Sequence, residues 1–432
     1  MQADILALAQ SRVDQAEVYG SEVDRTTVEF RANELYSQET RLTHGYGLRV
    51  IKNGRTGYAA STNPDRLNAL VDAAVETAEW GRATRIELPH EVKTPEVKTF
   101  ENRVIVLSAR RMHEWGAELI DAVRARVPDL KLDINFDRTY RQLRLTNSAG
   151  LDHEFARSEF SLGITGLLVL DGLFWLSDYE NLSDGHHPRI SEIADRFESR
   201  ARFARTRARL QSGTYPVIFA PQALPNLLYP IEFAVSGKTL EKGTSPLMGK
   251  VGQQLLDPKI SIYDNPLLDH GLLSSPIDGE GIARRRTPLF ERGIFRGFLF
   301  DMATAAACRQ ITTGSGNRDY ASPPSPGTTN IEISPGDFGL EQALRAMDNG
   351  LLVYDCIGGG QSNIMAGDIT LNISCGYKVE SGIITGRVKV ARIAGNVYEM
   401  LKKVEAVGDK CRDLGTYSVP FIELGDLKVA AR

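Results

Sequence analysis

The histidines of this chain do not have the spacing of a helical zinc protease. Such a helix needs two His four residues apart with a Glu beside the first, so that both imidazoles face one metal ion. Neither His90-Glu91 nor His113-Glu114 is followed by a second His at that distance. The remaining candidate metal ligands lie in a turn-rich segment that is more simply interpreted as a solvated loop: Asp184, His186 and His187.

Other catalytic signatures are also incomplete. Ser236-Gly237-Lys238-Thr239 is similar to the end of a phosphate-binding loop, but Glu232 stands where the loop requires its first Gly. The four cysteines form no CxxC pair, which excludes a zinc ribbon and indicates reduced thiols. Cys356 and Cys375 lie in apolar, β-like runs without a neighbouring His, so we expect small buried residues rather than nucleophiles.

The elements that must position these residues fall into two halves and together predict an α+β fold. Residues 1–212 combine strands of alternating polarity with amphipathic helices, which predicts an N-terminal domain of antiparallel strands and helices. Residues 213–432 carry short β-branched or aromatic runs between Gly and Pro clusters, which predicts a mainly β C-terminal domain with a few helices. The expected helices are 3–12, 64–81 (capped by Asn63), 108–126, 191–209, 222–235, about 300–310, 339–349 and 396–404.

Composition excludes several classes of protein. The 432 residues are 42% hydrophobic and 25% charged, which is typical of a folded soluble protein. The net charge of −4 disfavours nucleic-acid binding, and the arginines between Arg196 and Arg209 are expected to form a solvated helix face. Because the chain shows no signal peptide and no long apolar run, we expect a cytoplasmic protein without a membrane anchor.

Five ordered segments, together with an N-terminal one, carry a resemblance to a known family. They are SGKTLEKGTSPLMGKVGQQLLDPKISIYDNPLL, DGEGIARRRTPLFERGIFRGFLFDMATA, TGSGNRDYASPPSPGTTNIEISPG, IGGGQSNIMAGDITLNISCGYKVESGIITG, IAGNVYEMLKKVEAVGD and, near the start, GYGLRVIKNGRTGYAAST. Together they resemble the TldD/PmbA family, historically called modulators of DNA gyrase and now viewed as subunits of a cytosolic metalloprotease.

The resemblance points to the PmbA, or TldE-like, branch. In the TldD-like branch a helix carries HExxxH, and a later Cys-Gly block completes the metal site. Counted back from Lys242, the motif positions fall on Leu228, Tyr229 and Phe233, which cannot act as zinc ligands and carboxylate base. Cys411 comes too early for the metal-binding Cys and lacks the Gly.

The resemblance implies a subunit without a metal of its own. It implies a TldD-like partner that holds zinc, a peptide or unfolded small protein as substrate, and an enclosed chamber shaped in part by Gly358–Gly360 and Asn317-Arg318. Without its partner the chain is expected to form a homodimer through residues after 212. Two alternatives stay open: a regulatory protein acting on DNA gyrase, and a self-sufficient hydrolase that uses Asp184, His186 and His187.

Overall fold

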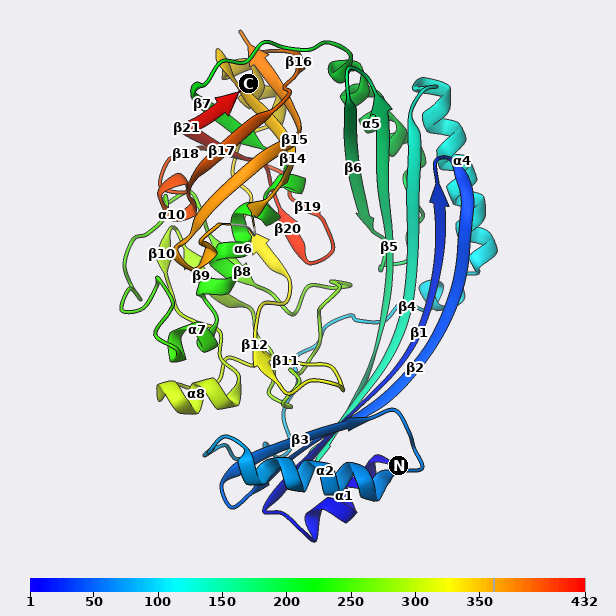
Figure 1. The fold of residues 1–432 in the computed structure, drawn as a ribbon, viewed down its shortest axis with the longest axis vertical. Coiled ribbons are helices and arrows are strands. Elements are labelled where there is room, and N and C mark those ends of the chain that lie inside the picture. The colour runs from blue at the N-terminus through cyan, green and yellow to red at the C-terminus, as the bar shows by residue number, and fades with distance from the viewer. Residues whose placement is uncertain (360–361, 432) are drawn as a thin grey trace.

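The protein consists of two lobes that face each other across a cleft (Figure 1). The computed structural model describes residues 1–359 and 362–431. We call residues 1–205 the sheet lobe, because a six-stranded antiparallel sheet in the order β3-β2-β1-β4-β5-β6 dominates it. Its strands are β1 (Gln15–Arg31), β2 (Glu34–Lys52), β3 (Arg55–Ser61), β4 (Lys131–Asn147), β5 (Asp152–Val169) and β6 (Leu173–Asn181).

Tight turns and alternating polarity explain this sheet. Asn53 and Gly54 both have positive φ, as a two-residue hairpin between β2 and β3 requires. Side chains alternate between faces along each strand, so Val28 and Phe30 of β1 face the convex side. That side is covered by α4 (Ala109–Arg126) and α5 (Ile190–Arg205), whereas α1 (Gln2–Gln10) and α2 (Leu67–Trp80) cover the end near β3 (Figure 1).

The second lobe, residues 213–431, is mainly β. Strand β14 pairs with both β7 and β15, so the strands β14, β7, β21, β17 and β15 close on themselves. A second sheet has the order β10-β9-β8-β13-β20-β19. The strands are β7 (Gly213–Phe219), β8 (Ile262–Asp264), β9 (Thr287–Glu291), β10 (Ile294–Phe295), β11 (Gly316–Asn317), β12 (Ser325–Pro326), β13 (Ile331–Ile333), β14 (Asn349–Ile357), β15 (Asp368–Glu380), β16 (Ile383–Arg387), β17 (Ala391–Asn396), β18 (Val404–Val407), β19 (Arg412–Asp413), β20 (Tyr417–Val419) and β21 (Ile422–Ala431).

Short helices complete the two lobes. They are α3 (Asn102–Ile105), α6 (Pro225–Ala234), α7 (Gly237–Glu241), α8 (Met302–Cys308), α9 (Leu340–Ala346) and α10 (Val397–Met400), with 3-10 turns η1 (Pro221–Ala223) and η3 (Ile364–Ala366). Among the described residues, no helix combines the length and the apolar character that crossing a bilayer requires.

The predicted α+β class is confirmed, and several details of the prediction are wrong. Asn63 does not cap α2: the helix begins at Leu67 after Arg66, and the Asn63 side chain accepts a hydrogen bond from the backbone of Asp65 instead. The helix expected at 396–404 is a single turn, because β18 begins at Val404. The expected boundary at residue 212 stays a prediction.

One core cluster crosses between the lobes. Tyr377 of β15 is fully buried among sheet-lobe residues, and its hydroxyl donates a hydrogen bond to the Arg200 carbonyl at 2.9 Å. Its ring packs against Phe174 and Phe203. The lobes are therefore joined by a continuous apolar core at the end of the molecule near α5 (Figure 1).

The aromatic core behind the sheet carries much of the stability of the sheet lobe. Phe160 is 1% exposed, and its ring centroid lies 6.1 Å from those of both Phe136 and Trp115. We expect Phe160→Ala to lower the free energy of unfolding by about 3–5 kcal/mol, because it leaves a cavity in a packed core. Urea unfolding followed by tryptophan fluorescence measures this. Leu42→Ala, at a side chain that is 77% exposed, is the control and should change stability by less than about 0.5 kcal/mol.

Candidate functional site

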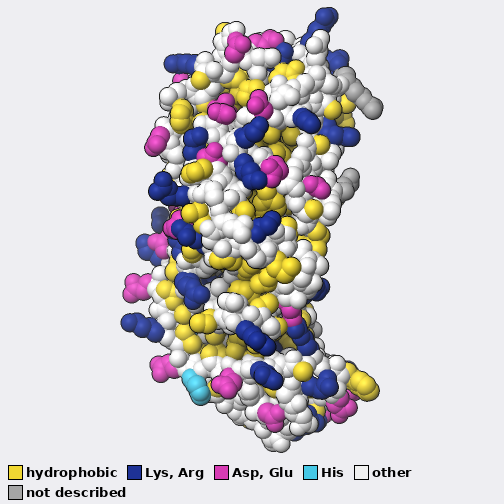
Figure 2. All heavy atoms as spheres, turned by 90° about the vertical axis from the view of Figure 1, so that its left-hand side faces the viewer, with side chains coloured by type: hydrophobic (Ala, Val, Ile, Leu, Met, Phe, Trp, Pro, Cys, Tyr) yellow, Lys and Arg dark blue, Asp and Glu magenta, His cyan; other side chains and the backbone are white. Residues whose placement is uncertain are grey.

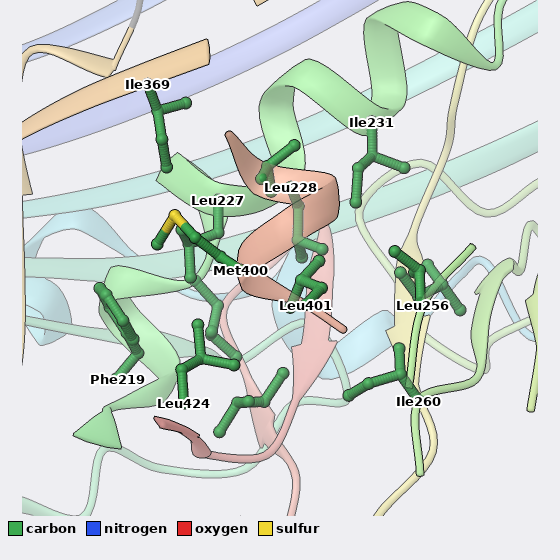
Figure 3. Packing of buried hydrophobic residues seen from close by; sticks show 14 of the residues in the cluster. Phe219, Leu227, Leu228, Ile231, Leu256, Ile260, Ile369, Met400, Leu401 and Leu424 are labelled. Atoms are coloured by element: carbon green, nitrogen blue, oxygen red, sulfur yellow. The ribbon is translucent and has the colours of Figure 1, made fainter. Parts of the chain in front are cut away.

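Helix α6 is packed into the core of the second lobe rather than open to a metal ion. It begins at Pro225, whose missing N–H is no loss in the first turn. Leu227, Leu228 and Ile231 point from this helix into the apolar cluster, where Leu228 meets Leu401 (Figure 3).

The three motif positions therefore diverge. Leu228 is 2% exposed inside the core, Tyr229 is 49% exposed, and Phe233 is half-buried. None of these side chains can hold zinc, so the residues present do not fit the metal. Across residues 1–359 and 362–431, no group of three or more His, Cys, Asp or Glu could hold a metal ion.

The one carboxylate on α6 is occupied by hydrogen bonds. Glu232 accepts one from the Thr328 hydroxyl and one from the Tyr417 hydroxyl, both at 2.7 Å. Burial, reinforced by the neighbouring Glu232, raises the pKa of Tyr417, which keeps this hydroxyl protonated as a donor. Glu232 thus ties α6 to β20 and to the loop before β13.

The alternative metal ligands do not converge either. The Nδ1 atom of His186 contacts the carboxylate of Asp184. The His187 ring instead packs edge-on against Trp115, with ring centroids 5.2 Å apart. The cysteines are no better placed for chemistry, because burial raises the pKa of Cys375 to about 11 and also raises that of Cys356.

The residues predicted to shape a chamber lie in different places. Asn317 and Arg318 lie on the cleft between the lobes. Gly358 and Gly359 follow β14, and Gly360 lies outside the described residues.

Four charged side chains are buried together where the lobes meet. Arg49 of β2 contacts Glu17 of β1 at 3.0 Å and Glu280 of the second lobe at 2.5 Å. Arg318 of the second lobe reaches the other oxygen of Glu17 at 2.5 Å. Each of these side chains is at most 4% exposed. We call Glu17, Arg49, Glu280 and Arg318 the interlobe ion network.

The carboxylates of Glu280 and of its neighbour Asp278, both in the second lobe, are buried and poorly solvated. Burial raises the pKa of Glu280 to about 7; Arg49 opposes this shift, whereas the nearby carboxylates of Asp278 and Asp301 reinforce it. Burial likewise raises the pKa of Asp278, although this carboxylate accepts backbone hydrogen bonds from Glu280, Ile282 and Gly316 at 2.8–2.9 Å. The loops that carry these residues have little regular structure, so some of their backbone N–H groups have no strand or helix carbonyl to bind. The carboxylates accept these hydrogen bonds instead.

A cleft of about 360 Å³ opens beside the interlobe ion network. Its walls are the concave face of β1, β4 and β5 on one side and the loops 273–284 and 317–319 on the other. Five arginines line it, together with apolar side chains and two aspartates: Arg141, Arg144, Arg157, Arg284, Arg318, Tyr19, Leu143, Leu145, Phe155, Leu273, Ile277, Asp278 and Asp319. Apart from Asn317-Arg318, the residues of this site could not be predicted from the sequence, because they are separated by up to about 300 positions.

The expected solvated arginine face is wrong for two of its residues, while Arg202, Arg205, Arg207 and Arg209 are exposed. Arg196 and Arg200 of α5 are not a solvated face: both contact the buried carboxylate of Asp178, at 2.7 and 3.4 Å. Arg412 of the second lobe contacts the same carboxylate. Their combined charge lowers the pKa of Asp178 despite its burial, so this cluster is a further polar tie between the lobes.

Comparison with known proteins places this architecture. Residues 212–431 match the PmbA/TldA metallopeptidase C-terminal domain, and residues 16–78 match the PmbA/TldA metallopeptidase domain 1. The chain therefore belongs to the PmbA/TldD family of metalloprotease-like proteins.

Individual relatives match over most of their length. The chain is 26% identical to Metalloprotease PmbA of Escherichia coli O157:H7, covering 99% of this chain and 94% of that protein. It is 28% identical to an uncharacterized protein of Methanocaldococcus jannaschii, covering 89% of each. The crystal structure of TldE from Thermococcus kodakarensis shares the fold, with a TM-score of 0.91 at 23% identity over 99% of both chains.

The raised pKa of Glu280 predicts a pH-dependent stability. The folded chain holds the Glu280 proton more tightly than the unfolded chain does. The stabilisation that comes from this difference is fully present below the ordinary pKa of a glutamate and is lost as the pH rises through about 7. We expect Glu280→Gln to cost more stability at about pH 5 than at about pH 8.

Urea unfolding at the two pH values measures this difference. Glu39→Gln, at an exposed side chain of the sheet lobe, is the control. A cost of Glu280→Gln that grows with pH would contradict the assignment.

Proposed function

We propose that this protein is the non-catalytic, metal-free subunit of a TldD/TldE-type metalloprotease in the cytoplasm, paired with a TldD-like subunit that holds zinc. The observation that carries the proposal is the packing of α6. Leu228 fills the core where a first metal ligand is needed, and neither Tyr229 nor Phe233 can replace the base or the second ligand. Membership in a metalloprotease-like family supports the reaction class.

In this proposal the chain binds and encloses substrate rather than cleaving it. Peptides or unfolded small proteins enter the space between the lobes, where arginines and apolar side chains line the cleft. The partner supplies the zinc-bound water and the general base.

An apolar outer surface supports a subunit role. Figure 2 shows hydrophobic side chains gathered along the middle of the face that the second lobe turns away from the sheet lobe. Exposed apolar side chains of this lobe include Tyr229, Met248, Val251, Ile311 and Ile357. Extended apolar surface is unfavourable in water, so we propose that a partner covers it: the TldD-like subunit, or a second copy of this chain when that subunit is missing.

Activity should belong to the pair. We expect the purified chain to carry well under one equivalent of zinc and to leave unfolded peptides intact, whereas adding the TldD-like subunit from the same organism should produce cleavage that a chelator abolishes. Metal analysis and a peptide-cleavage assay measure both.

Two results would favour the alternatives. Near-stoichiometric zinc that disappears in the double variant His186→Ala, His187→Ala would favour a self-sufficient hydrolase. Recovery of DNA gyrase without a TldD-like subunit in a pull-down would favour a regulatory protein.

The isolated chain should be a homodimer. We expect light scattering at micromolar concentration to give twice the 47.6 kDa chain mass, with an interface of about 2,000 Å² or more formed mainly by residues after 212. Ile311→Asp, at an apolar side chain that is 84% exposed, tests the surface because a buried unpaired charge opposes association. A monomeric wild-type chain would count against the chamber-subunit proposal.

A further inference from the structure

The cleft beside the interlobe ion network is lined by more arginines than aspartates. Arg157 of β5 contacts Glu159 at 2.6 Å, and Arg141 of β4 reaches the same oxygen only at 3.8 Å. One carboxylate therefore serves two guanidinium groups. Arg284 is buried, and its hydrogen bonds go to neutral acceptors, among them Ser275 and Asn317.

Several guanidinium nitrogens in this cleft have no acceptor within the described residues. They are Nε and Nη2 of Arg318 and Nε of Arg141, all shielded from water. The Arg318 side chain is 0% exposed, and its guanidinium lies over the Tyr19 ring at 4.8 Å, which fixes its position. These buried nitrogens do not face the open cleft, but their N–H groups lack acceptors, so their positive charge adds to that of the arginines that do line it.

The carboxylates around the cleft are already engaged, Glu159 by Arg157 and Glu17 by Arg49 and Arg318. Asp278 uses its oxygens on backbone N–H groups, and burial raises its pKa. Asp319 is exposed at the rim, and Arg144 is paired with Asp152 at 2.7 Å. In the part of the chain that is described, neither Asp278 nor Asp319 lies within salt-bridge distance of Arg141 or Arg157.

One wall of the same cleft is apolar. Tyr19, Leu143, Leu145 and Ile277 form one buried cluster, with Phe155 packed against it. A bare inorganic anion would leave uncovered the two apolar lining residues that this cluster supports at the surface, the half-buried Phe155 and Leu273, which is 38% exposed. A ligand that carries both a carboxylate and a neighbouring apolar side chain matches both halves of the cleft, and about 360 Å³ is within the range of small-ligand sites.

We propose that this cleft binds the free C-terminal carboxylate of a peptide, with the last side chain against the apolar wall. The proposal rests on the proposed function for the peptide nature of the substrate. Arg141 and Arg157 hold the carboxylate. The buried Arg318 and Arg284 add positive charge beside it, and Phe155 and Leu273 contact the last side chain of the peptide. Binding a free end selects peptides over the internal loops of folded proteins.

A direct binding assay on the isolated chain tests the proposal without any cleavage. The probe is a peptide labelled at its N-terminus with fluorescein, of sequence Gly-Ser-Gly-Ala-Leu, with a free C-terminus, compared with its C-terminal amide by fluorescence anisotropy. We expect the acid to bind at least about tenfold more tightly than the amide, because charge-assisted hydrogen bonds to arginine are lost in the amide. Equal binding of the two peptides, or no binding of the acid, overturns the proposal.

Variants locate the site. Arg141→Gln and Arg157→Gln should each abolish the preference for the acid, and an unchanged urea midpoint shows that they fold. Arg110→Gln is the matched control, since Arg110 lies on α4 behind the sheet with its side chain 85% exposed, and it should keep the preference. A preference that survives both cleft variants overturns the proposal.

Competition with inorganic phosphate distinguishes a peptide site from a simple anion site. Phosphate that displaces the acid peptide at equal concentration would assign the cleft to phosphate and overturn the peptide proposal. The proposed function is tested separately by the cleavage assay. If the chain prefers the acid peptide but forms no active pair with a TldD-like subunit, the peptide site stands and only the protease role is overturned.

Discussion

The interlobe ion network is the contact on which the arrangement of the two lobes depends. Charges that are at most 4% exposed must be paired, because an unpaired buried charge costs several kcal/mol. Glu17 and Arg49 come from neighbouring strands, whereas Glu280 and Arg318 come from loops with little regular structure. Glu17 and Arg49 pair with each other within the sheet lobe, whereas Glu280 and Arg318 of the second lobe find their ion-pair partners in the sheet lobe, and these contacts hold the lobes together beside the cleft.

The two sides of the second lobe differ in character. The cleft between the lobes is rich in arginine, while the outer face of the second lobe carries a band of apolar side chains among charged ones (Figure 2). Helix α6 contributes to the core beneath that outer face, and its buried side chains stabilise the lobe instead of carrying out chemistry. Helix α6 thus belongs to the core of the second lobe, as the proposed metal-free subunit requires.

Local patterns in the sequence predicted the fold class because they depend on neighbouring residues. Alternating polarity indicated the N-terminal sheet, and the helices behind it followed from their amphipathic patterns. The cleft could not be predicted in this way, since Tyr19, Arg141, Arg157 and Arg284 meet only through tertiary structure. Arg196 and Arg200 of α5 were wrongly expected to be solvated for the same reason: their partner, Asp178, lies on a strand, and a charge stripe alone does not reveal it.

The central claim is that zinc lies in the partner and not in this chain. Anomalous diffraction at the zinc edge, from crystals of this protein purified together with its TldD-like subunit, tests it most directly. We expect one anomalous-difference peak for zinc within the partner, and none near α6 or near Asp184 and His186 of this chain. A peak coordinated by residues of this chain alone would contradict it.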